Sequence, residues 1–284
     1  FATLQEAASR GVSIGAHPGY EDRPGFGRRI IPMAPPEIGR MVAAQIGALA
    51  GVAALAGAPL AYVKPHGALA NLAADDDQVA AAILAAIMAQ PGPLAVLAIS
   101  GTALEQAARA AGHPVYSEIF ADRAYLPNGR LMPRNRPGAV LHDAQAVLAR
   151  LLRFLDTGRM EVSGGDPIPL RAESICVHGD TPGAVEIAAP LRGGLQGGGV
   201  TLAPFRPPPG AAQGARAPPR PRPQRHASPR LPTMRYWWNS PKPSPLRPMR
   251  RSWALTRHWR RGPAPVCARR CRPMSISWSI LTPA

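Results

Sequence analysis

Histidine, lysine, aspartate and arginine recur along this chain in four short polar clusters. The clusters are His17-Pro18-Gly19-Tyr20, Lys64-Pro65-His66-Gly67, Ala121-Asp122-Arg123 and His178-Gly179-Asp180. Imidazoles and carboxylates exchange protons near neutral pH, and lysine and arginine hold carboxylates or phosphates. These residue types predict acid–base chemistry next to an anion-binding group.

Each cluster directly follows a short apolar segment. We predict buried strands at 12–16, 60–63, 94–99, 115–120 and 174–177, and helices at 1–10, 35–57, 76–90, 102–111, 142–157 and from 182 to about 191. Alternating strands and helices predict an α/β fold with a parallel sheet, either a barrel or a doubly wound sheet. The carboxyl ends of parallel strands share one face, so we expect the four clusters to meet at one pocket.

Single residues leave alternatives open. Lys64 and His66 lie two positions apart and would face the same side of an extended strand. A buried lysine there needs an anion, such as a substrate carboxylate or phosphate, although it could also extend to solvent. A turn histidine bonded to backbone and a structural ion pair at Asp122 and Arg123 are the simpler interpretations of the other clusters.

Two further segments could take part in the pocket. The loop Gly25-Phe26-Gly27-Arg28 could receive a phosphate on its backbone amides and Arg28, or be an ordinary surface loop. Cys176 precedes His178 in a predicted strand, and we interpret it as a small buried side chain rather than a nucleophile. No phosphate-binding motif of the G-x-x-x-x-G-K-[ST] type occurs in the sequence.

Charge divides the chain into two parts. The 284 residues carry a formal net charge of +16, yet residues 1–192 contain all 17 acidic residues and only 16 of the 33 basic ones. Residues 193–284 hold the remaining 17 basic residues, all five tryptophans and no acid. We therefore predict a folded domain at 1–192 and a Pro/Arg-rich, disordered basic tail at 193–284.

The tail has competing explanations. Interleaved arginine and tryptophan could bind single-stranded nucleic acid, but translation of GC-rich DNA out of frame explains the loss of every acid better. Cys267 and Cys271 lack the second ligand pair of a zinc site. No apolar run long enough to span a membrane is expected, since 41–61 is interpreted as a buried helix. With no signal peptide recognised, we expect a cytoplasmic protein.

Four ordered segments carry a resemblance to a known family. They are GVSIGAHPGYEDRPGFGRR (11–29), VKPHGALANLAADD (63–76), SEIFADRAYLPNGRLMPRNRPGAVL (117–141) and ICVHGD (175–180). Together they resemble the LamB/YcsF family, the A subunit of ATP-hydrolysing 5-oxoprolinase. The resemblance covers roughly residues 1–192 and implies a parallel barrel-like fold of the glycoside hydrolase/deacetylase type.

The resemblance also implies a reaction. The family cleaves the cyclic amide 5-oxoproline (pyroglutamate) to L-glutamate with ATP as co-substrate, and its members work with B and C subunits. On this interpretation His66, Asp122, His178 and Asp180 are the catalytic candidates. The substrate-binding candidates are His17, Arg28, Lys64, Asn71 and Arg123. A requirement for a divalent metal stays open.

The chain departs from the family in ways that keep other hypotheses open. The Asp-rich first strand of the family is missing, so we expect an N-terminally truncated barrel, and Ala70 replaces the usual tyrosine before Asn71. The alternatives are a metal-dependent deacetylase-like hydrolase with an Asp/His/His ligand set, an inactive truncated copy, and a nucleic-acid-binding protein acting through the tail.

Overall fold

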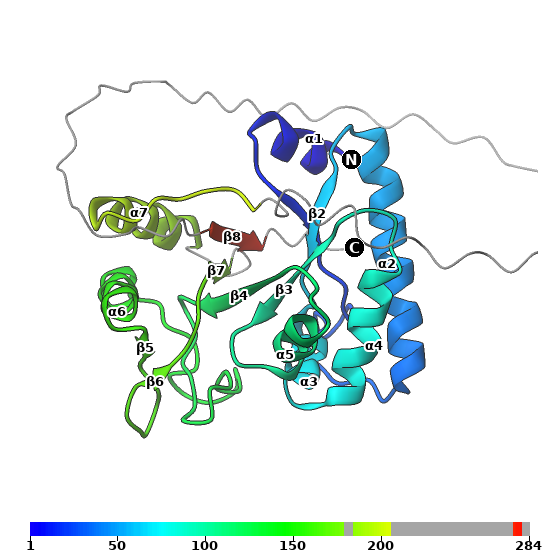
Figure 1. Cartoon of the computed structure of the whole chain (residues 1–284). Coiled ribbons are helices and arrows are strands. Elements are labelled where there is room, and N and C mark those ends of the chain that lie inside the picture. Colours follow the sequence, from blue (N-terminus) through cyan, green and yellow to red (C-terminus); the bar gives the residue numbers. More distant parts are fainter. Residues whose placement is uncertain (179–183, 206–274, 280–284) are drawn as a thin grey trace, which may run out of the picture. The chain divides into compact units, whose positions relative to one another are not determined.

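The structure, a computed structural model, describes residues 1–178, 184–205 and 275–279 (Figure 1). All described residues belong to one compact unit. The helices are α1 (Ala2–Ser9), α2 (Pro35–Leu55), α3 (Gly67–Asp75), α4 (Asp77–Met88), α5 (Ala103–Ala110), α6 (Ala144–Thr157) and α7 (Ala184–Gly197). The strands are β1 (Ile14–Ala16), β2 (Leu60–Val63), β3 (Ala95–Ile99), β4 (Val115–Phe120), β5 (Arg159–Met160), β6 (Ile168–Pro169), β7 (Ser174–His178) and β8 (Ser275–Ser279).

Five strands form a curled parallel sheet in the order β1-β2-β3-β4-β7, a half barrel in shape, and β8 pairs with β7 in parallel beyond them. A two-stranded antiparallel ribbon, β5 with β6, lies outside this sheet. Strands β3 and β7 are buried along nearly their whole length, as expected of strands covered on both faces. The α/β fold and the parallel sheet predicted from the sequence are confirmed.

Helix boundaries follow from local capping. Asp76 accepts hydrogen bonds from the backbone N–H groups of Gln78 and Val79, so α4 begins directly after it. Asp143 caps α6 in the same way, and Gly158 ends that helix in the left-handed conformation with φ 68°. No helix was predicted from the sequence between His66 and Asp76, where the structure has α3.

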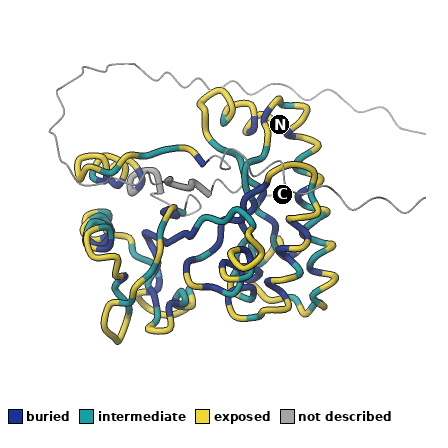
Figure 2. The backbone as a smooth tube through the Cα atoms, viewed as in Figure 1, coloured by how far each residue is buried: buried dark blue, intermediate teal, exposed yellow. Residues whose placement is uncertain are grey.

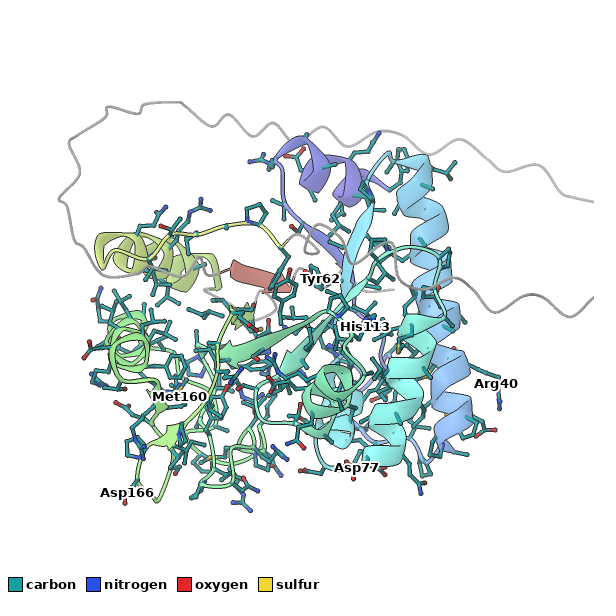
Figure 3. The ribbon with its side chains drawn as sticks, in the orientation of Figure 1. Arg40, Tyr62, Asp77, His113, Met160 and Asp166 are labelled. Atoms are coloured by element: carbon teal, nitrogen blue, oxygen red, sulfur yellow. The ribbon has the colours of Figure 1, made fainter. Side chains whose placement is uncertain are left out.

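The core consists of two main apolar clusters. One cluster joins α2, α3, α4 and α5 to β2 and β3, around Ile38, Ile83 and Val96. The other joins α6 and α7 to β4 and β7, around Leu151 and Ile175. Figure 2 shows these segments as buried stretches beneath exposed outer helix faces. In Figure 3, Arg40 on α2 and Asp77 on α4 point away from the core.

Helix α2 is long and apolar enough to cross a membrane by length and composition. It buries Ile38, Val42, Ile46 and Ala53 and packs against α4. Its other face is exposed, with Leu55 79 % accessible. The sequence analysis interpreted 41–61 as a buried helix, whereas the structure buries one face of α2. Core helices of globular proteins share this length and composition, so the feature alone does not indicate a membrane span.

The predicted boundary at residue 192 falls inside α7, which was expected to end in glycine near Leu191. The helix continues to Gly197 and buries Leu191 and Leu195. Glycine favours this packing, since a Cβ at Gly194 would overlap the side chain of Leu148 on α6. The glycines that suggested a loop therefore allow two helices to approach closely.

Residues beyond α7 also contact the sheet. Phe205 is buried, and its ring centroid lies 5.2 Å from that of Tyr62 and 4.7 Å from that of Tyr116. Ser13 Oγ donates a hydrogen bond of 2.5 Å to the carbonyl of Phe205. The end of α7, the buried Phe205 and strand β8 are thus among the described parts of residues 193–284, and disorder of the tail stays a prediction. The rest of the predicted tail lies outside the described residues.

Candidate active site at the carboxyl ends of the strands

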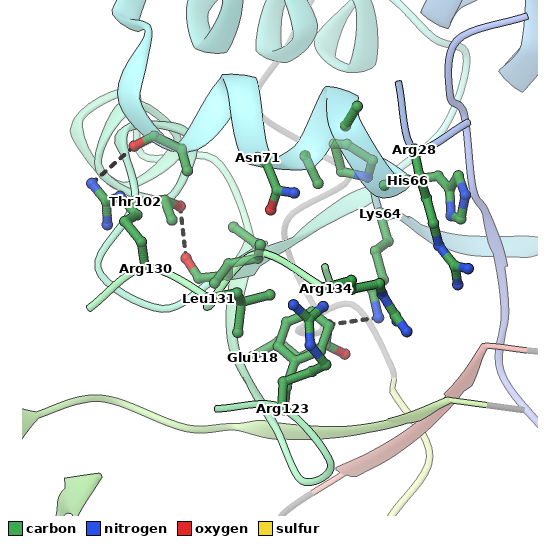
Figure 4. Close-up of a pocket in the computed structure, with 18 of the residues that line it drawn as sticks. Arg28, Lys64, His66, Asn71, Thr102, Glu118, Arg123, Arg130, Leu131 and Arg134 are labelled. Carbon is green, nitrogen blue, oxygen red and sulfur yellow. Dashed lines mark hydrogen bonds and ion pairs between the residues drawn. The ribbon is translucent and has the colours of Figure 1, made fainter. Parts of the chain in front are cut away.

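A cavity of about 700 Å³ opens where the strands end. Its lining includes seven side chains singled out from the sequence, namely His17, Arg28, Lys64, His66, Asn71, Arg123 and His178. Figure 4 labels five of them, Arg28, Lys64, His66, Asn71 and Arg123. Asp122 contacts His178, one of the lining residues. Asp180 lies outside the described residues. The structure therefore brings the four polar strand ends to one place, while the chemical role of each residue remains a prediction.

Lys64 is buried at the end of β2 and has protein partners. Its Nζ lies 2.6 Å from Glu118 Oε2 and donates a hydrogen bond of 3.2 Å to Cys176 Sγ. Glu118 Oε1 accepts a hydrogen bond of 3.2 Å from Ser174 Oγ. Burial by itself lowers the pKa of Lys64, but its interactions with Cys176 and Glu118 outweigh burial, so the pKa is raised. The anion that a buried lysine requires is supplied here by β4 of the protein itself.

Cys176 is fully buried in β7, as the sequence indicated. Burial raises the pKa of its thiol to about 12, although the nearby ammonium of Lys64 acts in the opposite direction. The thiol is therefore protonated at neutral pH, which leaves the carboxylate of Glu118 as the charged partner of Lys64. A protonated, buried thiol is a poor nucleophile.

His17 and His66 contact one another directly. Their nitrogens His17 Nε2 and His66 Nδ1 are 3.0 Å apart, and the two rings meet edge to face. His17 Nδ1 lies 2.6 Å from the carbonyl oxygen of Lys64, and His66 Nε2 lies 2.7 Å from that of Phe26. Burial, followed by the charges of Lys64 and His66, lowers the pKa of His17 to about 3. Every ring nitrogen of this pair is thus engaged by a protein group.

Asp122 and His178 form a second pair at the cavity. Both carboxylate oxygens of Asp122 lie 2.9 Å from His178 Nδ1. The side chains of Asp122 and His178 are 6 % and 12 % exposed, respectively. A carboxylate on Nδ1 fixes the tautomer in which Nε2 is unprotonated and accepts a proton. This arrangement suits a general base.

Arg123 lines the cavity and also braces the loop between β4 and α6. Its Nε and Nη2 donate hydrogen bonds of 3.1 Å and 2.5 Å to the carbonyls of Ala139 and Met132. Burial, together with the nearby charge of Arg134, lowers the pKa of Arg123 to about 10. The structure gives bracing contacts to Arg123 and pairs Asp122 with His178.

The same loop supplies a wall of the cavity through Arg130, Met132 and Arg134. Arg130 Nε contacts Asp75 Oδ1 at 2.5 Å, and its Nη groups donate to the carbonyls of Gly101 and Ala74 at 3.0 Å and 3.1 Å. This side chain joins the loop to the end of α3 and to the turn after β3. Arg130, Arg134 and Glu118 were not predicted as site residues from the sequence. For Glu118, the signal that could have identified it is an acidic residue within the otherwise apolar strand Val115–Phe120.

The loop at Gly25–Arg28 does not present open amides. The N–H groups of Gly25 and Arg29 donate to the carboxylate of Asp22, and those of Phe26, Gly27 and Arg28 donate to backbone carbonyls. Hydrogen bonding to Arg29 lowers the pKa of Asp22 to about 2. The suggestion that these amides cradle a phosphate is therefore wrong, because all five donate within the loop. Arg28 itself reaches the cavity wall.

The described residues contain no group of three His, Cys, Asp or Glu side chains arranged to hold a metal ion. His17 and His66 are bonded to each other and to carbonyls, and His178 is bonded to Asp122. Within this part of the chain, the Asp/His/His set that a metal-dependent deacetylase needs is not formed.

Comparison with known proteins gives consistent matches over this segment. The model of the LamB/YcsF family matches residues 1–209. Proteins named as the A subunit of 5-oxoprolinase from Nitrobacter hamburgensis, Rhodopseudomonas palustris and Paracidovorax citrulli are 46 %, 48 % and 48 % identical to this chain. Each match covers 72 % of this chain and 80–82 % of the relative.

A solved structure has the same fold. The crystal structure of the lactam utilization protein from Thermus thermophilus superposes with a TM-score of 0.65 at 39 % identity, and the match covers 72 % of this chain and 81 % of that one. The matched family segment contains every described residue of the cavity lining. The resemblance inferred from the sequence is confirmed, and the chain belongs to the LamB/YcsF family.

Proposed function

We propose that this chain is the A subunit of an ATP-dependent 5-oxoprolinase, which opens the lactam of 5-oxoproline to give L-glutamate together with B and C subunits. The observation that carries the proposal is the 46–48 % identity to proteins named as this subunit, over the segment that builds the whole described cavity. The names of these relatives also support the existence of partner chains. With ATP as co-substrate, we expect a cytoplasmic enzyme.

A five-membered lactam is an unreactive amide, so phosphorylation of its oxygen by ATP, which leaves as ADP, would activate the carbonyl carbon. After water adds to this carbon, the C–N bond of the ring would break and its nitrogen would take a proton, and hydrolysis of the resulting acyl phosphate would release phosphate and L-glutamate. The addition step requires an activated water molecule. His178, with Nδ1 held by Asp122, is the group best arranged to remove a proton from that water through Nε2. Asp122 would then stabilise the imidazolium that forms.

Binding of an anionic substrate requires positive charge on the cavity wall. Arg28 and Arg134 line the cavity from two different loops, and Arg123 lies between β4 and the second of these loops. Lys64 contributes less net charge than the sequence suggested, because Glu118 neutralises it at 2.6 Å. We therefore assign the carboxylate and phosphate groups of the substrates to the arginines, with Asn71 as a neutral hydrogen-bonding partner on α3.

We also propose that the half barrel is related to the glycoside hydrolase/deacetylase barrels. The curl of the parallel sheet and the location of the cavity at its carboxyl edge support this relation. The assignment of the reaction nonetheless rests on the side chains that line the cavity and on the similarity to the named relatives, since one fold supports many chemistries.

The test is a reconstituted assay. The full chain is mixed with B and C subunits from a relative, and glutamate and phosphate are measured with 5-oxoproline and ATP present. We expect glutamate and phosphate to form together and in equal amounts. His178→Gln should abolish both, whereas His142→Gln, at an exposed position outside the cavity lining, should retain them. No glutamate from the wild-type chain, with B and C subunits that are active with their own natural partner, would refute the proposal.

A further inference from the structure

The contacts of His17 and His66 determine how many protons the two rings hold. The outer nitrogen of each ring contacts a backbone carbonyl oxygen: His17 Nδ1 lies 2.6 Å from that of Lys64, and His66 Nε2 lies 2.7 Å from that of Phe26. A carbonyl oxygen only accepts hydrogen bonds, so His17 Nδ1 and His66 Nε2 must each carry a proton. One further proton is required between the facing nitrogens, which are 3.0 Å apart.

Three protons on two imidazoles make a cation. Two neutral imidazoles carry only two protons, and with both of these donated to the carbonyls the facing nitrogens would present lone pairs to each other. Such a contact is repulsive at hydrogen-bonding distance. The observed chain of three contacts is therefore satisfied only when the pair carries one positive charge.

The charge belongs to His66 rather than to His17. Burial and the nearby charges of Lys64 and His66 lower the pKa of His17 to about 3, so His17 is neutral and accepts through Nε2. His66 then donates from both nitrogens, to His17 and to the Phe26 carbonyl. We propose that His66 is an imidazolium that borders the cavity as a fixed positive charge, and that His17 is the positioning residue that keeps it so.

The surroundings hold the ring of His66 in one orientation. A Cβ at Gly27, where φ is +64°, would lie 2.7 Å from His66 Cδ2, and one at Gly19 would lie 3.2 Å from His66 Cβ. The ring of Phe26 meets that of His66 edge to face, with centroids 5.6 Å apart. A ring clamped in this way keeps both hydrogen bonds and does not turn to act as a base toward the cavity. These contacts favour a fixed cation at His66 over proton transfer as the way in which this catalytic candidate takes part.

Other charges act on the pair from each neighbouring element. Besides the pair itself, the titratable and charged groups among the described lining residues are Lys64 after β2, Arg28 from the loop after β1, Asp75 from α3, Glu118 from β4, Arg123, Arg130 and Arg134 from the loop after β4, and His178 from β7. Asp75 is paired with Arg130. The cations disfavour the extra proton, Glu118 offsets Lys64, and the two carbonyls and His17 favour it through hydrogen bonds. The charge is accordingly expected to be lost as the pH rises, together with the contact between the rings.

This inference deepens the proposed function, and only its catalytic consequence rests on that function. A fixed cation beside the cavity would stabilise negative charge on an activated lactam oxygen or bind the substrate carboxylate. The number of protons on the rings of His17 and His66 depends on their contacts and not on the reaction, so it can be measured without an enzyme assay.

The direct test is ¹⁵N NMR of the full chain labelled at histidine, between pH 6 and 9. Resonances are assigned with His17→Gln and His66→Gln. We expect both nitrogens of His66 to be protonated at pH 7 and His17 to have a protonated Nδ1 and a bare Nε2. A neutral His66 at pH 7, with one unprotonated nitrogen, would overturn the proposal whatever the enzyme assay shows.

Two substitutions at His17 distinguish a role in hydrogen bonding to His66 from a role in packing alone. In His17→Gln the amide oxygen still accepts from His66, whereas in His17→Leu the substituted side chain offers no acceptor. We expect the basic limb of the kcat/KM profile to move by about one pH unit to lower pH in His17→Leu, a roughly tenfold loss at a fixed pH on that limb. His17→Gln should recover most of that shift. Equal shifts in the two variants, each with the thermal transition of a folded protein, would contradict the positioning role.

Discussion

The ammonium of Lys64 lies 2.6 Å from the carboxylate of Glu118 inside the half barrel, and both side chains are less than 10 % exposed. Lys64 directly follows β2 and Glu118 lies in β4, and these two strands are separated in the sheet by β3. Both line the cavity, so their pairing reduces the net charge that Lys64 presents there. An unpaired charge buried at this position would destabilise the folded state, and each partner reduces that penalty for the other.

Loss of one partner should therefore destabilise the fold more than loss of both. We expect Glu118→Gln to lower the free energy of unfolding by about 3–5 kcal/mol, because it leaves the ammonium of Lys64 without its buried counter-charge. The double variant Lys64→Met/Glu118→Gln should recover part of that loss. Urea unfolding of the two single variants and the double variant gives the coupling energy. Additive effects would show that the pair is not a stabilising unit.

Asp122→Asn should act on turnover rather than on folding. The amide keeps the shape of the side chain but not its charge, so the imidazolium formed at His178 during proton transfer is less stable. We expect kcat of the reconstituted complex to fall by roughly 10²-fold or more, with a smaller change in KM. Asp166→Asn, at an exposed loop position outside the cavity lining (Figure 3), is the control. A fall confined to KM would argue against a base at His178.

Arg130 should hold the loop between β4 and α6 in place. Arg130→Ala removes the contacts to Asp75, Ala74 and Gly101, so the loop should open more often. We expect amide hydrogen exchange in residues 126–135 to become about tenfold faster, which corresponds to roughly 1.4 kcal/mol. Arg136→Ala, an exposed arginine of the same loop, is the matched control. Unchanged exchange in Arg130→Ala would mean that the loop is held by its other contacts.

Acid should weaken the loop closed by Asp22 and Arg29. Hydrogen bonding to Arg29 lowers the pKa of Asp22 from 3.8 to about 2, so the folded state gains from this carboxylate fully above pH 3.8. That gain is lost as the pH falls through about 2. Urea unfolding between pH 2 and 5 should therefore show a smaller acid loss in Asp22→Asn than in the wild type. Asp166→Asn should follow the wild type, and an unaltered slope in Asp22→Asn would refute the assignment.

Glycine positions in α7 test whether the residues past 192 belong to the folded domain. Alanine at Gly193, where no atom lies within 4 Å of the added Cβ, should stabilise the protein by about 0.5–1 kcal/mol through helix propensity. Alanine at Gly194 should lose that gain, because Leu148 must move. Thermal unfolding of both variants is the measurement. Identical transitions would indicate that α7 does not pack on α6 in solution.

Local patterns along the chain are sufficient to predict β1, β2, β3, β4 and β7, their parallel sheet and the polar residues that follow these strands, but not β5, β6 or β8. Apolar periodicity is a local property, and a residue that follows a parallel strand is confined to one face of the sheet. His17, Lys64, His66 and His178 were therefore expected at one cavity before any contact was known. The ordered motifs between Gly11 and Asp180 likewise identified the family.

The partners of these groups could be found only in the folded chain. Glu118 follows no motif, and its pairing with Lys64 depends on the order and curl of three strands. The contact between His17 and His66, and the carbonyls that complete it, required two loops to close around one ring. Strand periodicity gives the face on which a side chain lies, whereas the charge it carries depends on neighbours that are distant in the chain.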